Sequence, residues 1–463
     1  MLRAIRRTGW IGFSGAAIAV VWGLYLQYRG VARSGDTVAL VGGARILWDC
    51  MREGTVPCTG VSQYPIFQHV PAMPFAMLRR PDWEPYSFLC YVSIASVALT
   101  ALITAALGRS IAGRFGAAFG VALVLSGPLI FYDATTWGEP LAALLMLLPI
   151  AALAFRSRWG WVLVAAFLAS ITKDTSPLTI VLLAAGVLAV RLRTEDRALL
   201  RAPALATLAG VVIGFLATVG FNEWRYQSWR NVVYIDEHPR PPGLDFVAKA
   251  GTAIWASPSG GLLVYWPLML ILVPLVVAAV VGIVQTGPRS MRLGRAAVLA
   301  ALLINTAILA DFAAPFGWVA WGPRLMLAWV IPVVVVLALL ERARVVGWAH
   351  LVARSRALLI LVALLAGAST LVNAAARVTD SWLRFFEARP VTDTYCPGVI
   401  YMSDAPVYFR CIGSLLWDRG GPLQYAFAGI GGGGLLVCLA LAVAIATVLL
   451  AARKFAAVAR VTS

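Results

Sequence analysis

Long apolar runs without charged residues restrict most strongly what this chain can fold into. Twelve such runs lie between charged segments, at residues 10–27, 86–107, 115–131, 139–155, 160–172, 176–190, 203–221, 262–284, 296–310, 325–340, 357–376 and 425–452. Most are long enough to cross a bilayer core as helices, which satisfy all their own backbone hydrogen bonds. The sequence therefore predicts an all-α polytopic membrane protein, with residues 1–463 as a single transmembrane domain.

Two neighbouring runs, 160–172 and 176–190, are shorter than the rest. A helix of thirteen residues reaches only about 20 Å into an apolar core of about 30 Å. We expect these two short helices to form a hairpin that enters and returns on the same side, so that the topology of the other spans is unaffected.

Charged residues are few and unevenly placed, which excludes an ordinary soluble domain and a nucleic-acid binder. The chain is 61% hydrophobic and 13% charged, with a formal net charge of +17. One set of alternate segments holds 21 Lys and Arg against 3 acidic residues, at 1–9, 108–114, 156–160, 191–202, 285–295, 341–356 and 453–463. Basic residues in short loops mark the cytoplasmic side. We therefore expect both termini to lie on the cytoplasmic side of a bacterial plasma membrane.

The other side is predicted to carry four longer outer segments: 28–85, 222–261, 311–324 and 377–424. No ionisable residue lies in the middle of a span, which argues against an ion-coupled carrier and places the chemistry at this outer surface. The first span is also compatible with a signal peptide, although its apolar run is longer than a typical h-region and favours an uncleaved anchor. The stretch from Asp36 to Trp48 has the helical period of an amphipathic interfacial helix.

Four of the six cysteines lie in pairs within outer segments, Cys50 with Cys58 and Cys396 with Cys411. In an oxidising compartment, two pairs that each lie within one loop favour two disulfides. The second disulfide would close a loop within residues 377–424, which we expect to cap the site. Four free thiols are the alternative, because the geometry of the partners is not visible in a sequence.

Short motifs resemble the GT-C superfamily of integral membrane glycosyltransferases that use polyprenyl-phosphate sugars, including mycobacterial arabinosyl- and mannosyltransferases. The matching segments, within about residues 10–340, are Gly35-Asp36, Tyr64-Pro65, Thr136-Trp137-Gly138-Glu139-Pro140, Lys173, Gly260 to Pro267, and Trp321-Gly322-Pro323-Arg324. Asp174 departs from the family pattern, in which proline follows the lysine. The resemblance implies a bundle of about 12 transmembrane helices and an inverting sugar transfer.

For such a transfer, the resemblance implies that Asp36 is the base that takes the acceptor's proton. The leaving group is a lipid phosphate, so cations that hold its charge matter, and Arg324 and Lys173 are the candidates. The alternatives are a loop carboxylate for Asp36, a Lys173 that only pairs with Asp174, and a span-end arginine for Arg324.

Asp133 and Glu139 lie in one turn and are candidates to orient the acceptor, act as a second acid or share a divalent cation. The sequence requires no cofactor and contains no metal-binding motif. It therefore does not predict whether a divalent cation takes part or which ion it would be. Candidate substrate-binding residues are His69, Tyr64, Glu237 and His238. His69 is equally suited to a structural role, and the aromatic residues of 222–261 suit a membrane-interface belt.

The leading hypothesis is a glycosyltransferase that moves a sugar from a polyprenyl phosphate to an envelope glycan, glycolipid or protein. Its partners would be that donor, the acceptor and membrane lipid. The alternative is a lipid-linked sugar flippase, or a non-catalytic envelope assembly protein with the same fold.

Overall fold

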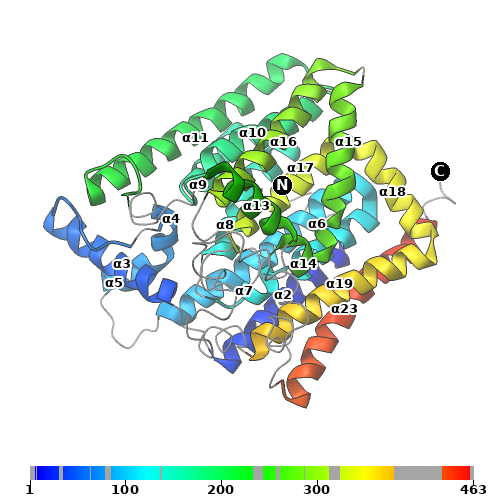
Figure 1. Cartoon of the computed structure of the whole chain (residues 1–463), viewed down its shortest axis with the longest axis horizontal. Helices are drawn as coiled ribbons and strands as arrows, with labels where there is room; N and C mark the ends of the chain where they lie inside the picture. The colour runs from blue at the N-terminus through cyan, green and yellow to red at the C-terminus, as the bar shows by residue number, and fades with distance from the viewer. Residues whose placement is uncertain are drawn as a thin grey trace.

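The computed structural model describes residues 6, 8–30, 35–62, 64–78, 85–135, 138–232, 243–256, 261–285, 287–311, 324–379 and 430–458 (Figure 1). Within these residues all regular structure is helical and no strand occurs, which confirms the predicted all-α class. The apolar helices are α2 (Trp10–Arg29), α6 (Pro85–Leu125), α8 (Glu139–Ala154), α9 (Trp159–Ser170), α10 (Ser176–Arg191), α11 (Arg197–Tyr226), α15 (Leu272–Val284), α16 (Arg289–Ala310), α17 (Leu327–Leu340), α19 (Arg356–Thr379) and α23 (Gly432–Val458).

Shorter elements connect these helices. They are α3 (Gly35–Glu53), α4 (Ile66–His69), η1 (Val70–Ala72), α5 (Met73–Leu78), α7 (Leu129–Tyr132), α13 (Gly243–Ala256), α14 (Leu262–Tyr265), η2 (Pro267–Ile271), η3 (Arg324–Met326) and α18 (Arg342–Arg354). The predicted interfacial helix of the first outer segment is α3, which runs five residues beyond the expected Trp48.

Seven helices in the described part of the chain are each long and apolar enough to cross a membrane, or eight if the bent pair α17 and α18 is one span. The predicted number of twelve is larger because α8, α9 and α10 are shorter helices and because α6 contains two predicted spans. The protein is a multi-pass membrane protein.

The outer surface of the bundle fits lipid rather than water. On α11, for example, Leu199, Leu205, Phe215 and Leu216 are all exposed. A soluble protein rarely exposes apolar residues in such numbers on one helix. By contrast, α8 and α17 are buried along almost their whole length and form the centre of the core with α6.

The break inside α6 separates two helix halves that pack closely against each other. Ala112 and Gly113 leave the helical conformation, and Gly113 has a φ of +62°, which glycine adopts without strain. Gly108 and Gly116 then meet across the break, because a Cβ added at either one would lie 2.1 Å from the carbonyl oxygen of the other. Small residues thus allow the two backbones to touch, as in many membrane helix pairs.

We expect Gly116→Ala to destabilise the protein, because the added methyl group must push the two halves of α6 apart. Overpacking of this kind costs about 1–3 kcal/mol. Gly160→Ala is the matched control, since a Cβ at Gly160 meets nothing within 4 Å. Thermal unfolding in detergent, followed by tryptophan fluorescence, should show a lower Tm for Gly116→Ala alone. Equal Tm values for the two variants would contradict the close contact.

The short helices α9 and α10 form the expected hairpin. Arg156, which precedes α9, and Arg191, which ends α10, both pair with Glu195, at N–O distances of 2.8 and 2.6 Å. The two open ends of the hairpin therefore lie together, and the turn with Lys173 lies at the far end.

Other segments predicted to share one membrane side also meet. Arg109 Nη1 donates to the Thr8 carbonyl oxygen at 3.2 Å, and Arg295 and Arg344 both pair with Glu341 at 2.5 Å. We call the end of the bundle with these contacts and α18 the basic end. The opposite end, which bears Glu139, is called the site end.

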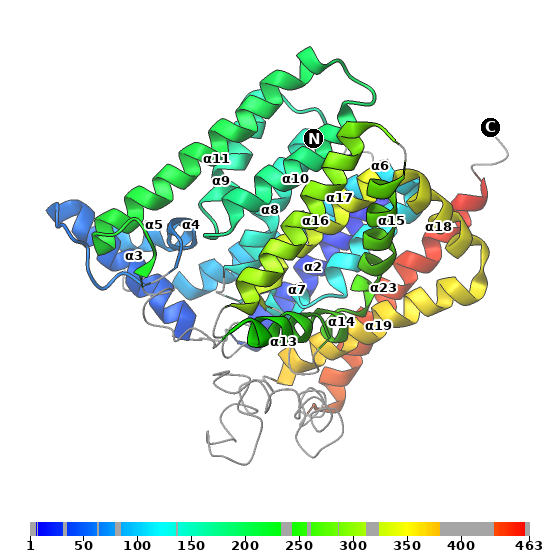
Figure 2. The same ribbon diagram turned by 45° about the horizontal axis from the view of Figure 1, so that its top comes forward.

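Two helices lie where only connecting segments are expected from the sequence. The segment 341–356 contains α18, which is bent by 97° from α17, and the segment 222–261 contains α13. In both Figure 1 and Figure 2, α18 lies on the far side of the bundle from α3, α4 and α5.

Candidate functional site

Three charged side chains from distant parts of the chain converge at the site end. Glu139 is the first residue of α8, where the N-terminal end of a helix favours a negative charge. Its Oε1 accepts a hydrogen bond from Arg324 Nε at 2.8 Å and lies 3.6 Å from Lys173 Nζ. The structure therefore joins the turn before α8, the tip of the α9–α10 hairpin and the beginning of η3.

The three side chains of this cluster are largely buried. Glu139 is 1% exposed and Arg324 is 6% exposed, while the Lys173 side chain keeps 22% of its surface accessible. One carboxylate faces two cations, and Glu139 Oε2 has no hydrogen-bond partner among the described residues. Cations with low exposure interact strongly with an added anion, because water screens them poorly.

Lys173 therefore does more than pair with its neighbour. Asp174 Oδ2 accepts a hydrogen bond from Asn231 Nδ2 at 3.5 Å. Lys173 lies 3.6 Å from Glu139 and also interacts electrostatically with Asp174, so its neighbour is not its only partner.

Asp133 follows α7 and is fully buried, beside Gly23 of α2 and within reach of the charge of Arg377 in α19. Its Oδ1 accepts the Ala134 backbone N–H at 3.1 Å, and a Cβ at Gly23 would lie 2.9 Å from the same oxygen. Burial raises the pKa of Asp133 well above its ordinary value, opposed by the Ala134 N–H and by the charge of Arg377. Asp133 Oδ2 has no hydrogen-bond partner among the described residues, so Asp133, like Glu139, has one buried oxygen without a hydrogen bond.

Asp36 is the second residue of α3, near the beginning of that helix. Its side chain lies outside the described residues, as do Glu237, His238, Cys396 and Cys411. Among the residues that are described, no group of three or more His, Cys, Asp or Glu is placed to hold a metal ion.

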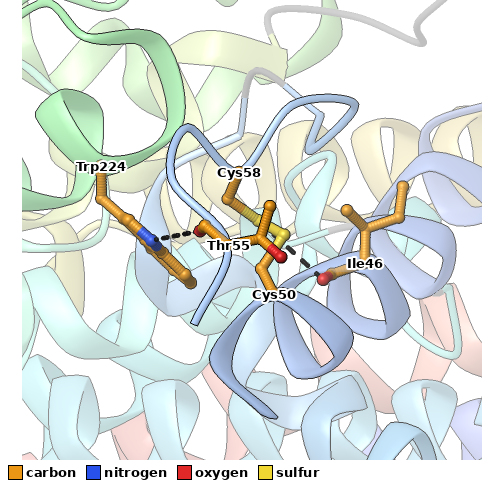
Figure 3. The surroundings of a disulfide bond; sticks show 5 residues. All are labelled: Ile46, Cys50, Thr55, Cys58 and Trp224. Carbon is orange, nitrogen blue, oxygen red and sulfur yellow. Dashed lines mark hydrogen bonds between the residues drawn. A yellow bond between two sulfur atoms is a disulfide. The ribbon is translucent and has the colours of Figure 1, made fainter. Parts of the chain in front are cut away.

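A disulfide joins Cys50, in the last turn of α3, to Cys58 (Figure 3). The Cys58 N–H donates to the Trp224 carbonyl oxygen at 3.1 Å, and the Trp224 indole N–H donates to the Thr55 carbonyl oxygen at 3.2 Å. The closed loop is therefore attached to the last turns of α11.

Arg225 fixes the next part of the first outer segment (residues 28–85), which we call the first segment. It is 1% exposed, lies between the rings of Phe221 and Tyr226 at 4.4 Å from each, and donates to the carbonyl oxygens of Ser62 and Tyr64 at 2.8 and 2.9 Å. Tyr64 is itself buried, and its backbone is bound to α11. Arg225 has no motif around it, so only the fold shows this role.

Gln68 connects the first segment to the charged cluster. Its Nε2 donates to the Thr172 carbonyl oxygen at 3.4 Å, and its amide carbon lies 3.0 Å from the position of a Cβ at Gly138. The Phe67 N–H donates to the Ile171 carbonyl oxygen at 3.4 Å. The first segment is thus wedged against both turns that supply Glu139 and Lys173.

His69 lies beneath α3, where its ring nitrogen atoms face protein groups. Nδ1 is 3.4 Å from the Leu40 carbonyl oxygen and Nε2 is 3.4 Å from Ser62 Oγ. The side chain is 1% exposed, and burial lowers the pKa of His69 to about 4. At neutral pH it is an uncharged packing residue in this arrangement.

The lowered pKa of His69 predicts acid lability. The pKa of a histidine in the unfolded chain is near 6.5. Between about pH 6.5 and 4, His69 is therefore protonated in the unfolded state but not in the folded state. This contribution to stability is present above about pH 6.5 and is lost as pH falls through about 4, a change of about 3 kcal/mol. We expect the Tm of His69→Gln to fall less than that of the wild type between pH 7 and pH 4.5.

His350→Gln is the matched control, because His350 is exposed on α18. It should keep the pH profile of the wild type. A His69→Gln profile that follows the wild-type curve would contradict the buried neutral histidine.

Comparisons with known proteins show similarity at the level of the backbone only. No protein-family model matches the chain, and no curated protein matches it. Two similar solved structures are of ArnT from Cupriavidus metallidurans, one bound to undecaprenyl phosphate and one in the apo state. They are 17% and 16% identical to this chain, with TM-scores of 0.47 and 0.45, and each match covers 96% of this chain and 78% of the other.

Proposed function

We propose that this protein is an integral membrane glycosyltransferase that takes a sugar from a polyprenyl-phosphate donor at the outer face of the plasma membrane. The observation that carries the proposal is the convergence of Glu139, Lys173 and Arg324 in one largely buried cluster. Each of these residues lies in a motif that resembles the GT-C superfamily, and the motifs are far apart in the sequence. A shared phosphate site accounts for their meeting.

In the proposed reaction, Arg324 and Lys173 hold the donor phosphate. Arg324 offers a planar fork for two oxygens, and Lys173 adds a point charge that remains partly accessible. Glu139 orients the two cations before the donor binds. Electrostatic stabilisation of the departing phosphate then replaces the need for a general acid.

Asp36 is the proposed base. Its carboxylate takes the proton of the acceptor hydroxyl while the acceptor oxygen bonds to the anomeric carbon. The bond between that carbon and the phosphate oxygen breaks, and the polyprenyl phosphate leaves with the electron pair. One displacement inverts the anomeric centre, and no covalent sugar–enzyme intermediate forms.

Asp133 is proposed to orient the acceptor. Its Oδ2 has no hydrogen-bond partner among the described residues, and this oxygen is proposed to contact a sugar hydroxyl. The acceptor is proposed to be an envelope glycan, a glycolipid or a protein.

The test of the donor is the lipid that the protein retains. Protein purified in mild detergent is extracted and analysed by mass spectrometry, and we expect a polyprenyl phosphate or its sugar conjugate in near-stoichiometric amount. The purified protein is then incubated with that conjugate and candidate acceptors. Transfer of the sugar supports the enzyme, whereas movement of the lipid across vesicles without transfer supports a flippase.

A further inference from the structure

Gln68 lies between the two turns that supply Glu139 and Lys173. It is 6% exposed and belongs to α4, the short helix of the first segment. Its Nε2 donates to the carbonyl oxygen of Thr172, the residue before Lys173, at 3.4 Å. Its amide carbon lies 3.0 Å from the position of a Cβ at Gly138, the residue before Glu139. One buried side chain therefore contacts the residue directly before each of the two charges.

The glycine at position 138 fits the close approach of Gln68. Gly138 has a φ of −76° and a ψ of −2°, close to the right-handed helical region that is open to all residue types. The backbone conformation therefore does not call for glycine. A Cβ at this position would have Gln68 Cδ, Cγ and Oε1 as its nearest atoms, at 3.0, 3.1 and 3.1 Å. The space that a side chain at 138 would need is thus occupied by Gln68.

The tip of the α9–α10 hairpin offers hydrogen-bond acceptors to α4. The carbonyl groups at the end of a helix need partners from outside that helix, and α9 ends just before this tip. The Ile171 carbonyl oxygen accepts the Phe67 N–H, and the Thr172 carbonyl oxygen accepts the Gln68 amide, both at 3.4 Å. The helix α4 thus holds the backbone that leads into Lys173.

The next residue joins the same short helix to α3. His69 Nδ1 lies 3.4 Å from the Leu40 carbonyl oxygen, and His69 Cε1 lies 2.7 Å from the position of a Cβ at Gly43. Leu40 follows Asp36 by four residues in α3, which is about 6 Å along the helix axis. Two adjacent residues, Gln68 and His69, therefore contact the turns of the charged cluster and the helix of the proposed base.

We propose that Gln68 is a positioning residue for the donor phosphate. It sets the separation of Lys173 and Glu139 and, through His69, the distance of these charges from α3. The Lys173 ammonium lies 3.6 Å from Glu139, which is longer than a direct hydrogen bond, so the placement of the Lys173 backbone decides where its charge lies. In enzymes, a misplacement of about 1 Å costs up to about 10²-fold in rate. The inference rests on the proposed function, because it assigns Gln68 to the same phosphate site.

The test measures the affinity of the full chain in detergent for undecaprenyl phosphate, by native mass spectrometry. Gln68→Ala removes both contacts, and we expect about tenfold weaker binding. Gln68→Met keeps the length of the side chain but does not donate a hydrogen bond, so the affinity should fall by about threefold to fivefold. This second variant also serves if Gln68→Ala does not fold. In transfer assays, the KM for the donor should rise while the KM for the acceptor stays unchanged.

Ile66→Ala is the matched control for a loss of stability. Ile66 also lies on α4, but it packs against the apolar cluster that contains Cys50 and Cys58. Its truncation should lower the Tm and leave the affinity for undecaprenyl phosphate within a factor of two of the wild type. A loss of affinity in Ile66→Ala equal to that in Gln68→Ala would indicate a general disturbance of α4 and would overturn the role of Gln68.

A further pair of variants tests the contact with the turn before α8. Gly138→Ala places a methyl group against Gln68 and should weaken the affinity, whereas Gly42→Ala should not, because a Cβ at Gly42 meets nothing within 4 Å. In Gln68→Ala this space is open, so the added Gly138→Ala should have no further effect. Additive losses, or an unchanged affinity in both Gln68 variants, would overturn the proposal alone. A wild type that binds no undecaprenyl phosphate would contradict the proposed function and, with it, this inference.

Discussion

Asp36→Asn is expected to abolish sugar transfer while the fold and the retained donor lipid are unchanged. Asparagine keeps the size of the side chain but does not take a proton at neutral pH, and a positioned base contributes about 10²–10⁴-fold to rate. The measurement is the initial rate of transfer from the donor identified by mass spectrometry, at saturating acceptor. The Tm and the amount of bound donor are recorded on the same sample.

Asp49→Asn is the matched control for this prediction. Asp49 lies on the same helix, α3. Its side chain is 45% exposed and its carboxylate is 3.8 Å from Arg52, a weak surface pair, so Asp49→Asn should leave the rate within a factor of two to three of the wild type. A fully active Asp36→Asn would show that another group takes the acceptor's proton. Equal losses in both variants would indicate a general disturbance of α3.

Arg324→Ala is expected to lose both donor binding and stability. It removes the closer of the two cations beside Glu139. Removal of one partner of a buried ion pair costs about 3–5 kcal/mol, and Lys173, which remains 3.6 Å from Glu139, offsets part of this loss. It also removes the fork proposed to hold the donor phosphate. We expect at least a tenfold weaker affinity for polyprenyl phosphate, measured by native mass spectrometry, together with a lower Tm.

Two comparisons separate these effects. Arg344→Ala removes a partner of another buried glutamate, Glu341, at the basic end, so it should lower the Tm without weakening donor binding. Lys173→Met removes a partly accessible charge and should weaken donor binding with a smaller loss of stability. If Lys173→Met and Arg344→Ala retain the donor equally well, the phosphate site is not at Glu139.

Much of the helical framework is predictable because a run of about twenty uncharged apolar residues indicates a membrane-spanning helix without any knowledge of the tertiary contacts. The predicted spans coincide with apolar helices, and the short 160–172 and 176–190 runs correspond to α9 and α10. Segments of mixed character are harder. The segment 341–356 contains apolar residues at helical spacing, Val345, Trp348 and Val352. The arginines on either side of them made the sequence predict a connecting loop there.

The members of the charged cluster are also predictable one by one, whereas their contact is not. Arg324 is 185 residues from Glu139, and only the packing of α8 against α17 brings them to 2.8 Å. Gln68 and Arg225 are different, because neither belongs to a recognisable motif. Their roles depend on backbone carbonyl oxygens of other segments, and every residue type has such an oxygen.

The wedge formed by the first segment also sets an order of assembly during synthesis. Cys50 and Cys58 are eight residues apart, so their loop closes without help from any later part of the chain. Gln68 needs Thr172, made 104 residues later, and Tyr64 needs Arg225, made 161 residues later. At about 5–20 residues per second, the second interval is on the order of ten seconds. During that time Tyr64 has no partner on α11, and the cluster of Glu139, Lys173 and Arg324 is complete only after the still later Arg324 has been made.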